Sequence, residues 1–332
     1  MNLIANNWKR WTLNAAAVCS FMLFTGLAQA APLAAGNPIL LPGTHGGFDF
    51  IRLDSANDRL LLGHEGNKSL DVFDLKSRKL LKSVPTGTAQ DAAADAEHGY
   101  YYVSGNDPSR TVIVNSKSLT VTGGVPLPAA TDLIAYDPVT GQIHECNDTA
   151  AEEWVINPTT KKVIATIHLK GRGLEDLAFG PGHKRLFQAV KGSNAIAVID
   201  PANNKVLNEF PLTPDKGPHG IAVVPENEGL LVACSGKLVL LDRSTGKVLA
   251  RAQIASRVDE MAYDPGIHLA YCASRQGEIS VVRVEHNQLI LSGSVPDERG
   301  TGSITVDPKT HTVWIAYHKG DECFVQPYTP TK

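Results

Sequence analysis

Acidic side chains stand at the heads of short apolar runs in this chain, where a buried strand would otherwise be expected. The octets TDLIAYDP, at 131–138, and VDEMAYDP, at 258–265, each place an aspartate one residue into such a run. A carboxylate in this position can bind a ligand or act as a general base, or it can accept hydrogen bonds from the backbone of neighbouring strands. The choice between these roles depends on the elements that position it.

The two octets are copies of a unit that occurs seven times. The Asp-Pro end of the octet, or a residue pair in its place, recurs at intervals of 40 to 44 residues, beginning at 54, 95, 137, 180, 224, 264 and 307. Each unit holds four short runs of Val, Ile, Leu and Tyr, separated by Pro, Gly, Asn and Asp, which are strand and turn signals. A period in the low forties with four strands per unit predicts an all-β, seven-bladed β-propeller of four-stranded antiparallel blades.

The blade boundaries follow from this period. We expect one domain over 31–332, with units at about 48–88, 89–129, 130–171, 172–214, 215–255, 256–297 and 298–330. The seventh unit lacks a fourth strand, and the run NPILLPG at 37–43 matches the fourth strands of other units. We therefore expect this N-terminal strand to complete blade seven and close the ring.

A family resemblance supports this fold. The stretch IAYDPVTGQIHECND at 134–148, followed by VINPTTKKVIATIHLKG at 155–171, resembles the YVTN-type repeat of YncE-like secreted propellers. The resemblance extends over essentially all of 31–332. It implies a seven-bladed ring with a binding role, although a minority of seven-bladed rings, such as streptogramin lyases, are metal-assisted enzymes.

The N-terminal residues have the pattern of a secretory signal. Lys9 and Arg10 precede an apolar run without acids at 13–27, and a small-x-small cleavage site follows. The run is shorter than the roughly 20 residues that span a bilayer, which favours a signal peptide at 1–30 over a membrane anchor. We expect a periplasmic or secreted protein. Its formal net charge of −3 gives no reason to expect nucleic acid or anionic lipid as a partner.

The sequence lacks the motifs that are typical of several kinds of site chemistry. The four cysteines after the signal segment form no Cys-x-x-Cys pair, so they match neither a zinc site nor haem attachment, and buried free thiols are favoured over one disulfide. There is no Gly-x-Ser-x-Gly, no phosphate-binding Gly-x-x-x-x-Gly-Lys and no dinucleotide-binding loop.

The repeat predicts which residues meet at one mouth of the central channel. The first strand of each blade lines the channel, and its head carries Asp49, Gln90, Asp132, Glu175, His219, Asp259 or Gly302. The second strands end on the same face. Convergent polar groups of both signs at a concave rim are typical of a ligand site. We predict a site for a small molecule or protein partner formed by Asp49, Asp132, Glu175, His219, Asp259, Arg275, His64, His318 and Asn147.

A structural role competes with this prediction. Acids at first-strand heads often accept backbone N–H groups or pair with an arginine of an adjacent blade, which holds the ring together. Asp91, Asp176 and Glu260 stand one place further along their strands than the mouth residues.

The histidines raise the question of a metal. His45, His64 and His318 fall on one sector of the ring beside Asp49, and three imidazoles with a carboxylate are a possible set for zinc, copper or iron. Their scattered positions form no motif, so hydrogen-bonding histidines are the other interpretation. The sequence thus favours a non-catalytic binding or scaffold protein. The alternative is a metal-dependent lyase or hydrolase with a divalent metal on these histidines and Asp49 or Glu175 as base.

Overall fold

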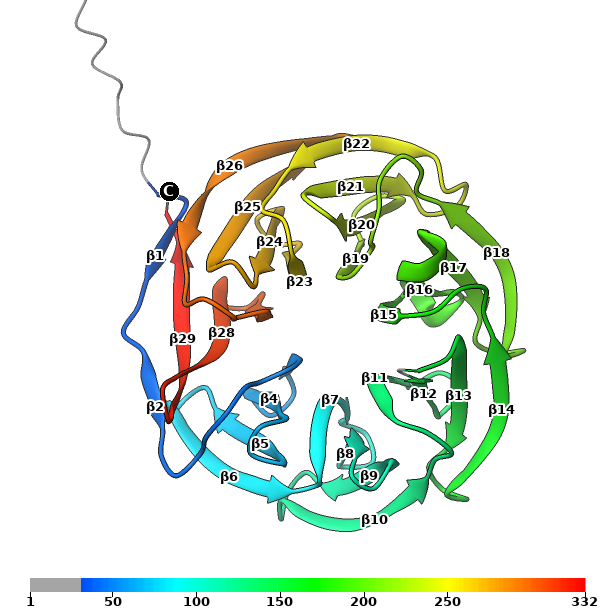
Figure 1. Cartoon of the computed structure of the whole chain (residues 1–332), viewed down its shortest axis with the longest axis vertical. Helices are drawn as coiled ribbons and strands as arrows, with labels where there is room; N and C mark the ends of the chain where they lie inside the picture. Colours follow the sequence, from blue (N-terminus) through cyan, green and yellow to red (C-terminus); the bar gives the residue numbers. More distant parts are fainter. Residues whose placement is uncertain (1–30, 148, 332) are drawn as a thin grey trace, which may run out of the picture. The chain divides into compact units, whose positions relative to one another are not determined.

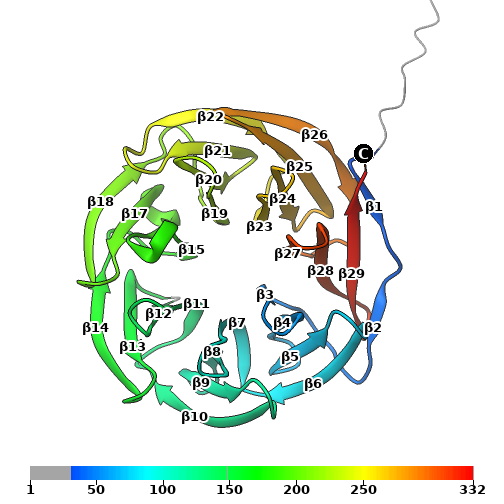
Figure 2. The same cartoon turned by 180° about the vertical axis from the view of Figure 1, so that it is seen from behind.

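Seven sheets are arranged as blades around a central axis (Figures 1 and 2). The structure is a computed structural model that describes residues 31–147 and 149–331, so the predicted signal peptide at 1–30 lies outside the described residues. Each blade is antiparallel, and its first strand is the innermost. The predicted seven-bladed β-propeller is therefore confirmed.

The blades use consecutive strands. Blade one consists of β3 (Ile51–Asp54), β4 (Arg59–His64), β5 (Ser69–Asp74) and β6 (Lys79–Pro85); blade two of β7 (Thr88–Asp95), β8 (Tyr100–Asn106), β9 (Arg110–Asn115) and β10 (Thr120–Pro126); blade three of β11 (Thr131–Asp137), β12 (Gln142–Asn147), β13 (Glu152–Asn157) and β14 (Lys162–His168). Blade four consists of β15 (Leu174–Phe179), β16 (Leu186–Val190), β17 (Ala195–Asp200) and β18 (Lys205–Pro211), with the short 3-10 helices η1 (Pro181–His183) and η2 (Lys191–Ser193) in its loops. Blade five consists of β19 (Ile221–Val224), β20 (Gly229–Cys234), β21 (Lys237–Asp242) and β22 (Val248–Gln253); blade six of β23 (Val258–Asp264), β24 (Leu269–Ser274), β25 (Glu278–Glu285) and β26 (Gln288–Pro296); blade seven begins with β27 (Ser303–Asp307), β28 (Thr312–Lys319) and β29 (Glu322–Pro330).

Burial explains the sequence pattern of each unit. The second and third strands, such as β4 and β5, are buried along almost their whole length because neighbouring blades cover both faces. They therefore read as continuous apolar runs. The fourth strand, such as β6, alternates between exposed and partly buried residues because only one of its faces is packed.

The ring closes in blade seven through residues from the other end of the described chain. Both β1 (Leu33–Ala35) and β2 (Ile39–Leu41) pair antiparallel with β29, and Leu41 lies opposite Cys323. Figure 1 shows these two strands in blue beside the red β29. The predicted closure by an N-terminal strand is confirmed, and β1 extends it beyond the predicted run at 37–43.

The core lies between the blades. One apolar cluster joins Leu60 and Phe73 of blade one to Trp314 of blade seven and Leu41 of β2. All four cysteines of the described chain are buried and carry no disulfide. No helix in residues 31–147 and 149–331 is long and apolar enough to cross a membrane.

Irregular pairing shapes the inner strands on the face that we call the mouth face, where first strands begin and second strands end. In blades two, three, four and six, the register between the first two strands shifts after the first strand residues, for example between Thr131 and Ile134. Two residues at each of these strand heads are therefore left out of the ladder within the blade. Such bulges re-aim side chains, and these pairs include Asp132, Glu175 and Asp259 of the predicted mouth.

Candidate functional site at the channel mouth

The heads of the innermost strands surround one cavity. The mouth cavity has a volume of about 330 Å³ and is lined by Asp49, Phe50, Glu65, Gln90, Asp132, Glu175, Asp176, Lys191, His219, Asp259 and Arg275. The structure thus brings together six of the seven predicted first-strand heads. Gly302 of blade seven lies beside the cavity, where a Cβ atom would come within 2.3 Å of an Asp259 carboxylate oxygen. Glycine at this position leaves room for the Asp259 side chain.

Charge in the mouth cavity is unbalanced. Its lining holds six carboxyl groups, of which Asp176 pairs with Arg52, and its only lysine or arginine residues are Lys191 and Arg275. Arg275 donates to Asp259, with Nε 2.7 Å from Oδ2, and its Nη2 lies 3.8 Å from Oδ1 of Asp49. Carboxylates crowded at a partly desolvated site repel one another, so this rim attracts positive charge.

The pKa of Asp49 is shifted by its position in the mouth cavity. Burial, followed by the negative charge of Asp259, raises the pKa of Asp49 to about 8, even though Arg275 opposes the shift. At neutral pH its carboxyl therefore holds a proton for most of the time. A positive ligand beside it would favour release of that proton.

Lys191, Glu175 and His219 form a second polar group on the rim. The Lys191 ammonium lies 3.2 Å from Oε1 of Glu175 and donates to Nε2 of His219 at 3.0 Å. Nδ1 of His219 lies 3.1 Å from the carbonyl oxygen of Gly217. Because Nε2 accepts a hydrogen bond, we assign the imidazole proton of neutral His219 to Nδ1. Lys191 lies in the short helix η2, which directly follows β16.

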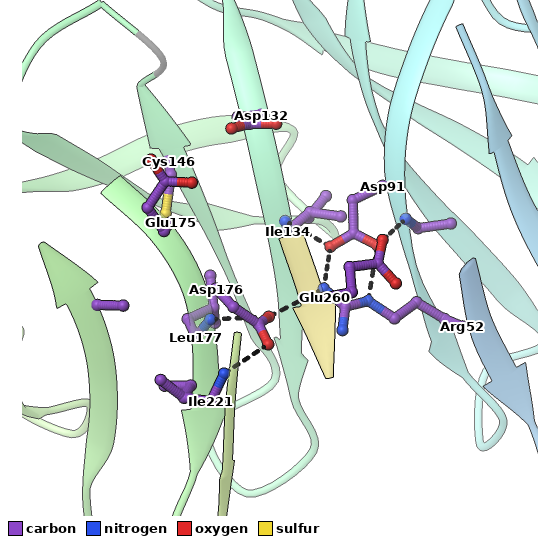
Figure 3. A network of polar contacts seen from close by, with 12 residues as sticks. Arg52, Asp91, Asp132, Ile134, Cys146, Glu175, Asp176, Leu177, Ile221 and Glu260 are labelled. Carbon is purple, nitrogen blue, oxygen red and sulfur yellow. Dashed lines mark hydrogen bonds and ion pairs between the residues drawn. The ribbon is translucent and has the colours of Figure 1, made fainter. Parts of the chain in front are cut away.

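Below the rim, three buried acids tie the blades together (Figure 3). Asp91 accepts the backbone N–H of Ile134, Asp176 accepts that of Ile221, and Glu260 accepts that of Ile304. In each case the acid belongs to an even-numbered blade and the N–H group to the first strand of the next blade. The structural role considered from the sequence is confirmed for these three residues.

Arg52 of β3 supplies the positive charge at this level. Its guanidinium donates to both carboxylate oxygens of Asp91, at 2.8 and 2.9 Å, and to Asp176 at 3.1 Å (Figure 3). Burial lowers the pKa of Arg52, but Asp91 and Asp176 outweigh this effect and raise it. Arg52 therefore links blade one to blades two and four across the channel.

Of the three acids, Glu260 has the fewest interactions that offset the cost of burying its charge. Among the described residues, its Oε1 atom has no hydrogen-bond partner, and burial raises its pKa well above the ordinary value. Burial also raises the pKa of Asp176, although Arg52 opposes the shift. A protonated Glu260 costs less to bury than an unpaired carboxylate, which is consistent with a structural position beside the acidic mouth.

The structure does not assemble the predicted three-histidine metal site. His64 is fully buried, with Nδ1 2.8 Å from Asp71 and Nε2 3.2 Å from the carbonyl oxygen of Gly46, so both ring nitrogens are engaged. His45 is exposed. No group of three or more His, Cys, Asp or Glu side chains in the described part of the chain is arranged to hold a metal ion.

Two further predicted residues lie apart from the mouth cavity. His318 is exposed and lines a cavity of about 140 Å³ that shares Glu65 and Arg275 with the mouth cavity. Asn147 is buried, and its side-chain oxygen accepts the backbone N–H of Thr149 at 2.9 Å, which fixes the turn after β12. The three residues do not line the mouth cavity, each for its own reason: His64 is buried against Asp71, Asn147 binds the turn after its strand, and His318 lines the neighbouring cavity.

Sequence reasoning missed Glu65, Lys191 and Arg52. Glu65 and Lys191 each follow the last residue of a second strand, so they stand one residue beyond the second-strand ends from which the mouth was predicted. Including the residue that follows each second strand would have identified both Glu65 and Lys191. The only sequence signal for Arg52 is a charged residue in a first-strand run, because its partners belong to other blades.

Comparisons with known proteins agree with this architecture. No protein-family model matches the chain, and no curated protein matches it. Among solved structures, the chain is similar to one titled hydrazine synthase of Kuenenia stuttgartiensis, with 14% identity over 86% of this chain and 97% of that chain and a TM-score of 0.74. It is also similar to U3-55K, with 13% identity, 91% and 99% coverage and a TM-score of 0.74. At these identities the likeness shows the fold alone.

The class of protein is therefore a seven-bladed β-propeller with a polar, acid-rich channel mouth. A propeller of this kind is consistent with a binding scaffold. The resemblance to YVTN-type repeats stays a prediction.

Proposed function

We propose that this propeller binds a small, positively charged ligand in the mouth cavity. The observation that carries the proposal is the excess of carboxylates at one end of the channel, around a cavity of about 330 Å³. That volume lies at the lower end of the range for small-molecule sites, roughly 300 to 1,000 Å³. The cavity therefore suits a compact amine or guanidinium compound better than a folded partner.

The rim is built for charge recognition. Asp49 and Asp259 come from different blades and converge on Arg275. Lys191 and Arg275 orient several of the acids but do not balance them, so an entering cation gains attraction from groups that folding has already brought together. The buried ties at Asp91 and Asp176 hold the strand heads in place below the rim.

Calorimetric titration with agmatine, which carries an amine and a guanidinium, tests the proposal. We expect saturable binding to the wild-type protein that weakens as salt is added, because the attraction is electrostatic. The Glu175→Gln and Asp132→Asn variants should bind agmatine at least about fivefold more weakly, because each removes one negative charge from the rim.

Asp58→Asn is the matched control. Asp58 lies in the turn between β3 and β4, away from the mouth cavity, where it pairs with Lys76 and Lys309. This variant loses one carboxylate by the same substitution as Asp132→Asn but leaves the mouth unchanged. Equal weakening by Asp58→Asn and Asp132→Asn, or no binding to wild type, would refute a cation site at the mouth.

We also propose that the protein works outside the cytoplasm. This rests on the predicted signal peptide at 1–30. The N-terminal sequence of the protein purified from its native compartment tests it: a chain that begins at about residue 31 supports export, and an intact N-terminus contradicts it.

A further inference from the structure

A second cavity adjoins the mouth cavity and has the opposite charge. It has a volume of about 360 Å³ and shares Lys191, His219, Asp259 and Arg275 with the mouth cavity. We call it the basic side cavity. Asp259 is its only acidic lining residue, whereas Lys191, Arg257 and Arg275 are all basic. Lys191 and Arg275 line both cavities, so the two differ because five carboxyl groups line only the mouth cavity and Arg257 lines only the basic side cavity.

Of the three basic residues that line this cavity, Arg257 forms the fewest ion pairs among the described residues. Lys191 pairs with Glu175, and Arg275 pairs with Asp259. Within 31–147 and 149–331, no acid forms an ion pair with Arg257, and this side chain is exposed in the linker before β23. Its guanidinium is therefore available for an anion that enters the basic side cavity.

Hydroxyl groups complete the lining. Ser235 and Ser256 line the basic side cavity, from the loops after β20 and before β23. Ser256 donates its hydroxyl proton to the side-chain oxygen of Gln276 at 2.8 Å, so it can only accept from a ligand, whereas Ser235 is exposed. Guanidinium, ammonium and hydroxyl donors together are the groups that recognise carboxylate or phosphate oxygens.

We propose that the ligand of the mouth is zwitterionic, with its cationic group in the acidic mouth cavity and an oxyanion in the basic side cavity beside Arg257. This inference rests on the proposed function, because it assigns the second half of the same ligand. The oxyanion is a carboxylate or a phosphate, since both are recognised by the same donors. The shared residues Lys191 and Arg275 lie at the boundary between the two halves.

Two matched series of compounds with increasing chain length test the inference by calorimetry. One series consists of glycine, β-alanine, 4-aminobutyrate and 6-aminohexanoate, and the second consists of the same compounds with the carboxylate replaced by a neutral amide. We expect one chain length at which the carboxylate improves the affinity for wild type by about three- to tenfold over its amide. Phosphoethanolamine, with ethanolamine as its matched amine, distinguishes a phosphate-preferring site from a carboxylate-preferring one.

Arg257→Gln identifies the place where the oxyanion binds. This variant should lose the gain from the carboxylate while its affinity for the amide series stays unchanged. Arg257→Lys should restore part of the gain because it keeps the charge. Arg172→Gln is the matched control, because Arg172 is an exposed linker arginine that lines neither cavity.

The outcomes separate the two proposals. If amides and agmatine bind but the carboxylate or phosphate adds nothing at any length, the zwitterion inference is wrong and the cation site stands. If the gain survives in Arg257→Gln, the oxyanion does not bind beside Arg257 and the inference is also wrong. If neither series nor agmatine binds wild type, the proposed function itself fails.

Discussion

The Nδ1 atom of His64 lies 2.8 Å from Oδ2 of Asp71, and both side chains are completely buried. The other ring nitrogen faces the carbonyl oxygen of Gly46 at 3.2 Å, and the thiol of Cys323 in blade seven donates to the same carbonyl at 3.4 Å. An imidazolium donates at both nitrogens, which fits these two acceptors. His64 is thus part of the junction where blade one meets the closing blade.

Replacing His64 should therefore affect stability rather than ligand binding. We expect His64→Ala to lower the free energy of unfolding by about 3 kcal/mol, because it removes the cationic partner of the buried Asp71 carboxylate and leaves Ser69 as its side-chain donor. Urea denaturation measures the loss, and agmatine titration of the folded fraction should give the wild-type affinity. His318→Ala, at an exposed histidine, is the control with little expected cost. Loss of binding in His64→Ala at wild-type stability would contradict this assignment.

The same pair makes stability depend on pH. Burial lowers the pKa of His64, but the hydrogen bonds with Asp71 and Cys323 outweigh it and raise the pKa from 6.5 to about 9. The folded protein therefore holds this proton more tightly than the unfolded chain. The resulting contribution, ~3 kcal/mol, is fully present below pH 6.5 and is lost as pH rises through about 9. Unfolding free energies at several pH values should show this fall in wild type, and a smaller one in His64→Gln.

Arg52 should be essential to the channel interior. Arg52→Met removes the only cation that contacts Asp91 and Asp176 among the described residues, and Asp91 is fully buried. We expect a loss of about 3 kcal/mol or more in unfolding free energy, because an unpaired buried carboxylate is costly. Adding Asp91→Asn to Arg52→Met should recover part of the loss. If the double variant is no more stable than Arg52→Met, the cost does not come from the stranded charge.

The closing strand provides a matched pair of leucines. Leu41 of β2 is 1% exposed and packs in the cluster between blades seven and one, whereas Leu40 is 46% exposed. Leu41→Ala should cost about 3 kcal/mol through the cavity that it leaves, and Leu40→Ala less than about 0.5 kcal/mol. Thermal or urea unfolding of the two variants measures the difference. Equal, small effects would mean that β2 contributes little to ring closure.

Ligand binding should release a proton near neutral pH. The pKa of Asp49 is raised to about 8 by burial and by Asp259, so this carboxyl is protonated at pH 6 and charged at pH 9. A cation binds the charged form better, so agmatine affinity should rise, by up to about tenfold, as pH rises through 8. Calorimetry in two buffers of different ionisation enthalpy counts the released proton. In Asp49→Asn, both the pH dependence and the proton release should disappear.

The sequence predicted the fold because the repeat carries it. Turn residues at intervals of 40 to 44 residues mark seven units, and residues in the same place of each unit occupy the same place in each blade. The same reasoning placed Asp49, Asp132, Glu175, His219 and Asp259 around one cavity. These residues could be predicted because they lie at strand heads that all point toward one axis.

The tertiary structure decided which residues adjacent to the strand heads and strand ends in the sequence also line the mouth cavity. Successive side chains of a strand point to opposite sides, so an error of one residue changes the surroundings completely. His64 turns into the blade and binds Asp71, while Glu65, one residue later, lines the mouth cavity. Glu260 accepts a backbone N–H of blade seven, while Asp259, one residue earlier, lies on the rim.

Contacts across the ring could not be predicted from the sequence either. Arg52 lies 39 residues from Asp91 and 124 residues from Asp176, and only closure of the ring brings the three together. No local pattern records such a distance, because the geometry depends on the angle between blades and not on the spacing of residues. The sequence by itself therefore determined the blades and the position of the acidic mouth, and the packing of blade against blade decided which acids stabilise the ring and which line the mouth cavity.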